Sequence, residues 1–247
     1  MRPDRPAGPV TFETFLARAL DDPDVLGVVL SGSQAREGAA TAHSDHDVYV
    51  IVADGSAFPP RRDAVLDVAV MTLGEFREHA LPGSGTAWDR YSFAYAKVLK
   101  DTGGIADLVT AKGTLSPEEA RSLAPEALGA FLNSAYRSLK NDRAGDLLAA
   151  RLDAADAVGS YLTYVFALHG RVRPYNKYLA WELRHHPLSL PMWSHEELLP
   201  LLEATLSPET ASAVRRLLND LEPRARAAGH GEEFDGWGDD LAFMRGR

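Results

Sequence analysis

The chain of 247 residues is long enough for one large domain or two modest ones, and its 45% hydrophobic and 25% charged residues are ordinary globular values. The net charge of −9, with no long basic stripe, argues against a polynucleotide partner, because lysine and arginine must replace the counterions of the phosphates. There is no apolar run of about 18 residues, no signal-peptide segment and no cysteine, which excludes a membrane span, disulfides and thiolate metal sites. We therefore expect a cytoplasmic protein without a membrane or nucleic-acid partner.

The first 112 residues alternate between short apolar runs and polar turns. An amphipathic helix is predicted to begin at Thr11, and the segment DDPD at 21–24 ends it. Apolar runs that are bounded by turn residues predict buried strands. We expect strands at 25–31, 47–52, 63–71 and 95–99, and helices at 72–81 and within 101–110.

From residue 113 to residue 247 the pattern is helical, and we predict no strand. Ser116 and Glu119 have the spacing of a capping box, with proline at the first helical position. The sequence therefore predicts an α+β protein, in which a small mixed β-sheet domain (1–112) precedes an all-α helical bundle (113–247). The helices of the bundle are expected at 116–123, 124–141, 144–170, 174–186, 195–206 and 207–229.

Two aspartates, Asp45 and Asp47, stand at the start of the second predicted strand. Residues i and i+2 of a strand point to the same face, so these two carboxylates converge. Like charges this close raise each other's pKa unless a cation lies between them, and Mg²⁺ is the natural cation for oxygen ligands. Asp67 lies within an otherwise apolar strand, where burial without a partner is costly. We expect it to open onto the same cleft.

Gly32 and Ser33 follow the first predicted strand. A glycine lets the backbone approach a phosphate closely, and nearby N–H groups and the Ser33 hydroxyl can donate hydrogen bonds to its oxygens. Ser44, just before the aspartates, adds a second hydroxyl. Each piece alone is more commonly a turn or a solvated strand end, but together they predict a metal–triphosphate site.

This combination resembles the DNA polymerase β-type nucleotidyltransferase superfamily: Gly32-Ser33, then eleven residues, then Asp45-x-Asp47 and a later strand carboxylate. The wording "GSQAREG…SDHDVYVIV" is similar to its minimal and antibiotic nucleotidyltransferases, and the likeness covers about residues 25–70. The resemblance implies a mixed sheet flanked by helices and two Mg²⁺ ions. It also implies transfer of a nucleoside monophosphate from a nucleoside triphosphate to a hydroxyl, with release of pyrophosphate.

The resemblance also assigns roles to single residues. Asp45 and Asp47 would be metal ligands, and Ser33 and Ser44 would contact the triphosphate. Asp67 takes a position that is either a metal ligand, which helps to lower the pKa of the acceptor hydroxyl, or the general base that accepts its proton.

Arg36 stands where the wording of the family often has an arginine. Two interpretations are open for it. It contacts a phosphate, or it caps the turn through a salt bridge to Glu37 or to another acid.

The helical half is similar in arrangement to aminoglycoside adenylyltransferases of the streptomycin/spectinomycin type. In those enzymes the acceptor lies between two domains, and a lysine after a proline-containing turn reaches the phosphates. The segment RPYNKYLAWEL (173–183) resembles that turn and makes Lys177 the candidate lysine, against a solvated residue at a helix start. Asp153 and Asp156 share a helix face that an arginine or an amino-sugar acceptor can neutralise, and Glu182 is a further candidate base. The alternative for all three is a structural or solvated carboxylate. The acceptor residues of those enzymes do not match one by one, so a role in antibiotic resistance does not follow.

The leading hypothesis is a magnesium-dependent adenylyltransferase. It moves AMP from ATP to a hydroxyl of a small molecule, for which an aminoglycoside-like acceptor is one candidate. The alternative is an antitoxin-type nucleotidyltransferase that adenylylates a partner protein, although the additional helical half favours a built-in acceptor domain. An inactive binding module is disfavoured because all three aspartates are present. Monomer and homodimer both stay open.

Overall fold

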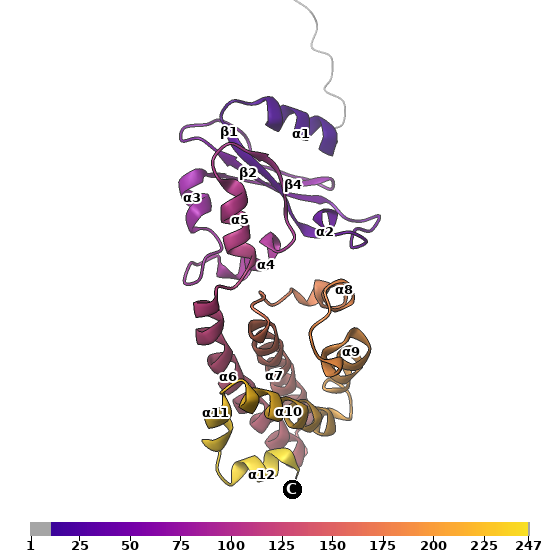
Figure 1. Ribbon diagram of the computed structural model, residues 1–247. Coiled ribbons are helices and arrows are strands. Elements are labelled where there is room, and N and C mark those ends of the chain that lie inside the picture. Colours follow the sequence, from indigo (N-terminus) through magenta and orange to yellow (C-terminus); the bar gives the residue numbers. More distant parts are fainter. Residues whose placement is uncertain (1–10, 247) are drawn as a thin grey trace, which may run out of the picture. The chain divides into compact units, whose positions relative to one another are not determined.

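The computed structural model describes residues 11–246, and the chain divides into two compact units between Thr114 and Leu115, two residues beyond the predicted boundary. The N-terminal unit contains, in chain order, α1 (Phe12–Asp21), β1 (Val25–Leu30), α2 (Gly32–Ala35), β2 (His46–Val52), β3 (Arg61–Arg62), β4 (Leu66–Thr72), α3 (Leu73–Glu78), the 3₁₀ helix η1 (Ala87–Asp89), α4 (Arg90–Phe93), β5 (Lys97–Asp101) and α5 (Ile105–Gly113) (Figure 1).

The five strands form one mixed sheet in the order β3-β4-β2-β1-β5. Strand β2 runs parallel to β4 and antiparallel to β1. Strand β5 pairs antiparallel with β1, and β3 pairs antiparallel with β4. The parallel pair brings the starts of β2 and β4 to one edge of the sheet. The antiparallel pair brings the end of β1 to the same edge, so three segments that are distant in sequence meet there.

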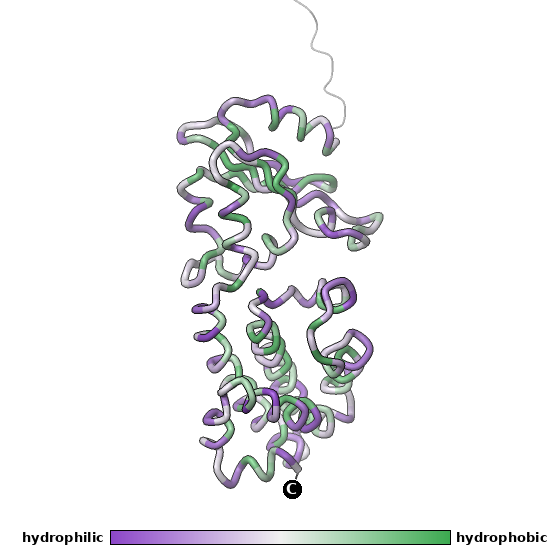
Figure 2. Tube along the Cα trace, in the orientation of Figure 1, coloured by the Kyte–Doolittle hydropathy of each residue, from purple (hydrophilic) through white to green (hydrophobic). Residues whose placement is uncertain are grey.

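Alternating apolar residues give this sheet two covered faces. Helix α1 packs against one face, and helices α3, α4 and α5 pack against the other (Figure 1). The strands are among the most hydrophobic parts of the N-terminal unit (Figure 2). The first core includes Phe15, Ala19, Val28, Val48 and Val50, and the second includes Val29, Ile51, Phe76, Phe93, Ile105 and Val109.

The C-terminal unit is helical in the part that the structure describes. Its longest helices, α6 and α7, are joined by residues 144–146 and lie side by side (Figure 1). No helix within residues 11–246 combines the length and the apolar character that a membrane span requires. The elements of this unit are α6 (Pro117–Arg143), α7 (Leu147–Leu168), η2 (Asn176–Tyr178), α8 (Leu179–His185), η3 (Pro191–Trp193), α9 (His195–Ala204), α10 (Thr210–Ala227), α11 (Gly231–Asp235) and α12 (Asp240–Arg245).

A small mixed sheet followed by helices confirms the predicted α+β class. The capping box at the start of α6 is confirmed as well: the Ser116 N–H donates to Glu119 Oε2 at 2.7 Å, and the Glu119 N–H donates to Ser116 Oγ at 3.1 Å. The predicted break near residue 124 is wrong, because α6 continues through Pro125. A proline inside a helix removes one backbone hydrogen bond; α6 nevertheless continues, and its residues Ala124, Ala127 and Leu128 around the proline are buried in the core.

The sequence analysis missed β3 and the segment η1–α4. A strand of two residues is too short to show alternation. The segment η1–α4 buries two polar side chains, Asp89 and Arg90, beside the apolar Tyr91 and Phe93, so it shows no clear apolar repeat in the sequence. The Arg90 guanidinium donates to the carbonyls of Lys112 and Thr114 at 3.1 and 2.6 Å, which fixes α4 to the end of α5.

Lys112, at the end of α5, is fully buried. Its ammonium donates to the carbonyls of His79 at 2.5 Å and Arg77 at 3.4 Å, and it lies 4.9 Å from the centre of the Phe76 ring. Burial, followed by the positive charge of Arg90, lowers the pKa of Lys112 from 10.5 to about 8.

This lowered pKa predicts a pH-dependent stability. Between pH 8 and pH 10.5 the unfolded chain binds more protons at Lys112 than the folded chain does, so the free energy of unfolding increases with pH. We expect the free energy of unfolding of the wild type to increase over this range by about 1–3 kcal/mol relative to that of Lys112→Met. Urea denaturation of both proteins at about pH 7 and about pH 10 measures the gain. A constant difference between the two proteins would contradict it.

Candidate active site

The side chains of Asp47 and Asp67 start from neighbouring positions on the sheet. They are Cα partners in the parallel β2–β4 pair, in strands that lie about 4.8 Å apart. Both belong to the face that α3, α4 and α5 cover further along the strands, and both are partly buried. Asp45 lies one residue before β2 and is also partly buried. The fold therefore places Asp47 and Asp67 together, with Asp45 adjacent along the chain.

Gly32 is the backbone position that lies against the Asp47 carboxylate. Its φ is +63°, in the left-handed region that favours glycine. A Cβ atom at this position would lie 1.8 Å from Asp47 Oδ2. The Ser31 N–H donates to the Asp47 carbonyl at 2.8 Å and ties the end of β1 to the start of β2. Any other residue at this position would have to displace the Asp47 carboxylate, which occupies the space of its Cβ atom.

Two predicted phosphate contacts, Ser33 and Ser44, lie at the two ends of the loop between Gly32 and Asp45. Ser33 is buried within α2. The Ser44 hydroxyl accepts a hydrogen bond from the Thr41 N–H at 2.9 Å, which closes a turn just before the aspartates. The contacts of these two serines with a triphosphate stay predictions.

Arg62 is a neighbour of the site that the sequence analysis did not assign. It is the register partner of Asp67 in the β3–β4 pair, and its Nε lies 3.4 Å from Asp67 Oδ2. The Arg62 side chain is 85% exposed, so the ion pair is worth at most about 1 kcal/mol. Asp67 therefore has Asp47 on one side and a weakly held guanidinium on the other.

Arg36 is buried, with 3% of its surface exposed. Its Nη1 donates to the Gly32 carbonyl at 2.6 Å, and its Nη2 donates to the carbonyls of Tyr91 at 2.9 Å and Ala94 at 2.8 Å. The predicted phosphate contact needs a guanidinium that faces a ligand. The observed contacts with the carbonyls of Gly32, Tyr91 and Ala94 instead favour the role of holding the turn.

A buried carboxylate, Asp89, forms a network that the sequence analysis also missed. Asp89 Oδ2 accepts from the Tyr49 hydroxyl at 2.6 Å and lies 2.8 Å from His79 Nε2, while Oδ1 accepts from the Ser92 hydroxyl at 2.6 Å. Tyr49 follows Asp47 by two residues and belongs to the same face of β2. Because Tyr49 and Asp89 are 40 residues apart in sequence, no local pattern could reveal this pair.

The donor chemistry of the site fits magnesium. Mg²⁺ takes oxygen ligands, and one or two carboxylates commonly hold it while substrate phosphates and water complete its shell. Asp47 and Asp67 supply two neighbouring carboxylates, and the missing Cβ of Gly32 leaves room for one of them. Within residues 11–246, no group of three or more histidine, cysteine, aspartate or glutamate side chains is close enough to hold a metal ion.

The C-terminal unit contains a polar pocket of about 660 Å³, lined mainly by α6 and α7. Glu126 and Asp156 contribute carboxylates, and Ser160 and Thr163 contribute hydroxyls. Arg173 also lines the pocket; burial lowers its pKa, and its Nη2 donates to Asn176 Oδ1 at 2.9 Å. The pocket therefore offers acids, hydroxyls and one guanidinium to a polar ligand.

The other candidate residues of the helical half lie elsewhere. Asp153 accepts hydrogen bonds from Arg137 Nε at 3.0 Å and from Asn141 Nδ2 at 2.8 Å, and Glu182 is buried in an ion pair with Arg171. These contacts favour structural roles for both acids. Lys177 is exposed in η2, with its ammonium 5.0 Å from the centre of the Tyr178 ring. Its contact with a nucleotide stays a prediction.

Comparison with known proteins finds distant likenesses among solved structures. No protein-family model matches the chain, and a search of curated proteins finds no match. Among solved structures, the chain is similar to a nucleotidyltransferase-like protein from Exiguobacterium sibiricum 255-15. The sequence identity is 13%, the TM-score is 0.39, and the match covers 94% of this chain and 87% of that one. A likeness this distant does not transfer a function.

The contact between Gly32 and Asp47 predicts a difference between two glycine variants. Gly38 has a φ of +72° with nothing within 4 Å of a Cβ, so Gly38→Ala costs only the backbone strain, about 1–2 kcal/mol. Gly32→Ala adds the collision with the Asp47 carboxylate. We expect Gly32→Ala to lose at least about 1 kcal/mol more than Gly38→Ala in urea denaturation. Equal losses would show that the Asp47 carboxylate does not lie against Gly32.

Proposed function

We propose that this protein transfers a nucleoside monophosphate from a nucleoside triphosphate to a hydroxyl of a small molecule, with ATP as the donor. The acceptor oxygen forms a bond to the α-phosphorus, the bond from that phosphorus to the leaving oxygen breaks, and pyrophosphate departs. The acceptor proton passes to a base or to water. The observation that carries this proposal is the placement of Asp47 beside Asp67 with Gly32 packed against the Asp47 carboxylate, within the motif "GSQAREG…SDHD".

In this proposal Asp47 and Asp67 hold Mg²⁺, with substrate phosphates and water completing its shell. Asp45 stays a ligand by resemblance to the superfamily, which also implies a second ion. A bound metal ion would stabilise charge on the phosphates and lower the pKa of the acceptor hydroxyl. We assign Asp67 to the metal rather than to proton transfer because its backbone position lies directly beside that of Asp47. Ser33 and Ser44 orient the triphosphate, and Lys177 stays the candidate phosphate lysine by resemblance to the adenylyltransferases.

We assign the acceptor to the pocket of the helical unit. Glu126 and Asp156 are exposed carboxylates that attract an ammonium group, and Ser160 and Thr163 can hydrogen-bond to hydroxyls. This lining supports a hydroxylated amine, of which an aminoglycoside-like compound is one example.

The first test is turnover. We expect the wild type to release pyrophosphate from ATP in the presence of Mg²⁺ and a panel of hydroxylated amines, and Asp47→Asn to lose at least about 100-fold in kcat. Asp107→Asn is the control, because Asp107 is an exposed carboxylate of the same unit outside the site. Label transferred from ATP to a protein band instead of a small molecule would support the antitoxin-type alternative. No turnover of any nucleoside triphosphate with any acceptor would refute the proposal.

The acceptor pocket predicts a separate effect on KM. We expect the double variant Glu126→Gln and Asp156→Asn to raise the KM for a cationic acceptor about tenfold or more, while the KM for ATP stays constant. Steady-state kinetics with each substrate varied in turn measures both constants. A change in the KM for ATP alone, or in neither constant, would remove the pocket from the proposal.

A further inference from the structure

We propose that Arg36 is a positioning residue for nucleotide transfer, which acts by fixing Gly32 relative to Asp47. The inference rests on the proposed function and adds to it a residue that touches neither phosphate nor metal. It starts from the shortness of α2. A helix of four residues cannot maintain itself, because forming the first helical turn costs more than its few hydrogen bonds return. Contacts from outside α2 must therefore set its place.

Arg36, the residue that ends α2, joins the helix to such contacts: its guanidinium makes one hydrogen bond within α2, to Gly32, and two outside it, to Tyr91 and Ala94. Its two terminal nitrogens donate to the carbonyls of Gly32, Tyr91 and Ala94 at 2.6–2.9 Å. The planar guanidinium presents its donors in fixed directions, so the three carbonyls are held in one geometry. The guanidinium also lies 4.8 Å from the centre of the Tyr91 ring, within cation–π range. Gly32 is therefore bound to a segment of chain almost 60 residues away.

The segment that receives Arg36 is itself strained. Tyr95, directly after Ala94, has a φ of +67°, a conformation that aromatic residues rarely adopt. Strain of about 1–3 kcal/mol persists only where the surrounding contacts determine it. The Tyr95 ring lies 5.9 Å from the Arg36 guanidinium. We infer that the contacts of Arg36 help to hold the strained turn at Tyr95.

The other end of this segment is anchored to the strand that carries Asp47. Asp89 accepts the hydrogen bond of the Tyr49 hydroxyl at 2.6 Å, and Tyr49 is two residues from Asp47 on β2. The chain from Asp89 to Ala94 thus connects β2 to Gly32 through Arg36. This link fixes the distance between the turn at Gly32, which is proposed to hold the phosphates, and the carboxylates of Asp47 and Asp67, which are proposed to hold the metal. A bound metal–triphosphate must span that distance.

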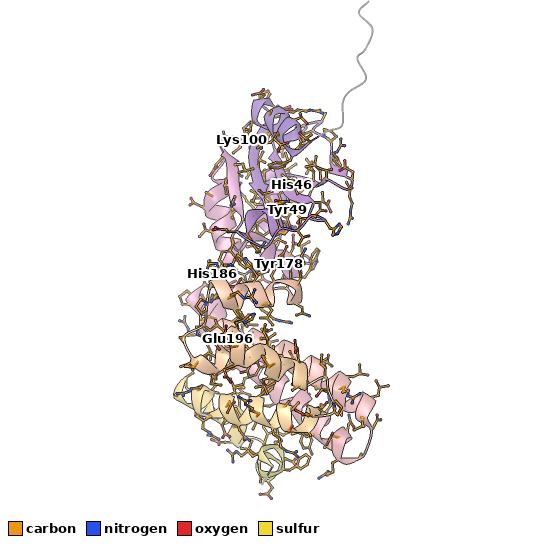
Figure 3. All side chains as sticks on the ribbon, turned by 90° about the vertical axis from the view of Figure 1, so that its right-hand side faces the viewer. His46, Tyr49, Lys100, Tyr178, His186 and Glu196 are labelled. Atoms are coloured by element: carbon orange, nitrogen blue, oxygen red, sulfur yellow. The ribbon has the colours of Figure 1, made fainter. Side chains whose placement is uncertain are left out.

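The chain offers a matched control in Lys100. Its ammonium also donates to three backbone carbonyls, those of Ala19, Leu20 and Asp22, at 3.4, 2.9 and 2.9 Å. These contacts close the end of α1, and Lys100 and Tyr49 lie at separate places in the N-terminal unit (Figure 3). Lys100→Met therefore removes a comparable set of hydrogen bonds without touching the candidate site.

The experiment compares Arg36→Met, Arg36→Lys and Lys100→Met with the wild type. Binding of a non-hydrolysable ATP analogue with Mg²⁺ is measured by calorimetry, turnover by pyrophosphate release, and stability by urea denaturation. We expect Arg36→Met to weaken analogue binding about tenfold or more, Lys100→Met to change it less than about twofold, and Arg36→Lys to recover part of the loss. If Arg36→Met does not fold, Arg36→Lys is compared with Lys100→Met in its place.

The outcomes separate this inference from the proposed function. If the wild type binds and turns over ATP while the Arg36 variants match Lys100→Met in affinity at equal stability, Arg36 is merely structural and the inference is overturned. If the wild type binds no nucleoside triphosphate, the proposed function fails, and the positioning role fails with it.

Discussion

The parallel register of β2 with β4 is the constraint on which the candidate site depends. It sets Asp47 beside Asp67, whereas a shift by one residue would turn one of the two side chains to the opposite face of the sheet. The antiparallel register of β1 with β2 then brings Gly32 against the Asp47 carboxylate. Two pairings within one sheet thus assemble a turn and two carboxylates from three separate stretches of sequence.

Buried polar groups of the N-terminal unit hold the loops around Gly32, Asp47 and Asp67 in place. Arg36, Asp89 and Lys112 are buried, and each forms a hydrogen bond with a backbone carbonyl or a hydroxyl of a different segment. Buried groups of this kind cost free energy when a partner is lost, so they tolerate few alternative arrangements. The loops around the site are therefore defined by specific hydrogen bonds more than by burial. A rigid site suits chemistry that depends on the spacing of charges.

Structure that depends on short-range sequence patterns was predicted correctly. The strands that carry Asp47 and Asp67, the capping box at Ser116 and the change from sheet to helices all follow from short-range patterns. What the sequence analysis missed depends on contacts over long distances along the chain: the pairing of Arg62 with Asp67, and the binding of Arg36 to carbonyls of α4 and the following turn. Of the polar pocket it indicated only Asp156, because the lining comes from two long helices and one loop residue. Spacing can indicate which residues share a face, but it cannot show which distant segment lies opposite.

The most direct test of the account is metal binding measured by electron paramagnetic resonance, with Mn²⁺ in place of Mg²⁺ and a non-hydrolysable ATP analogue. The account predicts that the wild type binds Mn²⁺ tightly when the analogue is present, and that Asp47→Asn and Asp67→Asn each abolish this binding while the proteins remain folded. Mn²⁺ binding that is unchanged in both variants would contradict the assignment of these carboxylates. An absence of analogue-dependent binding in the wild type would contradict the metal–nucleotide site itself.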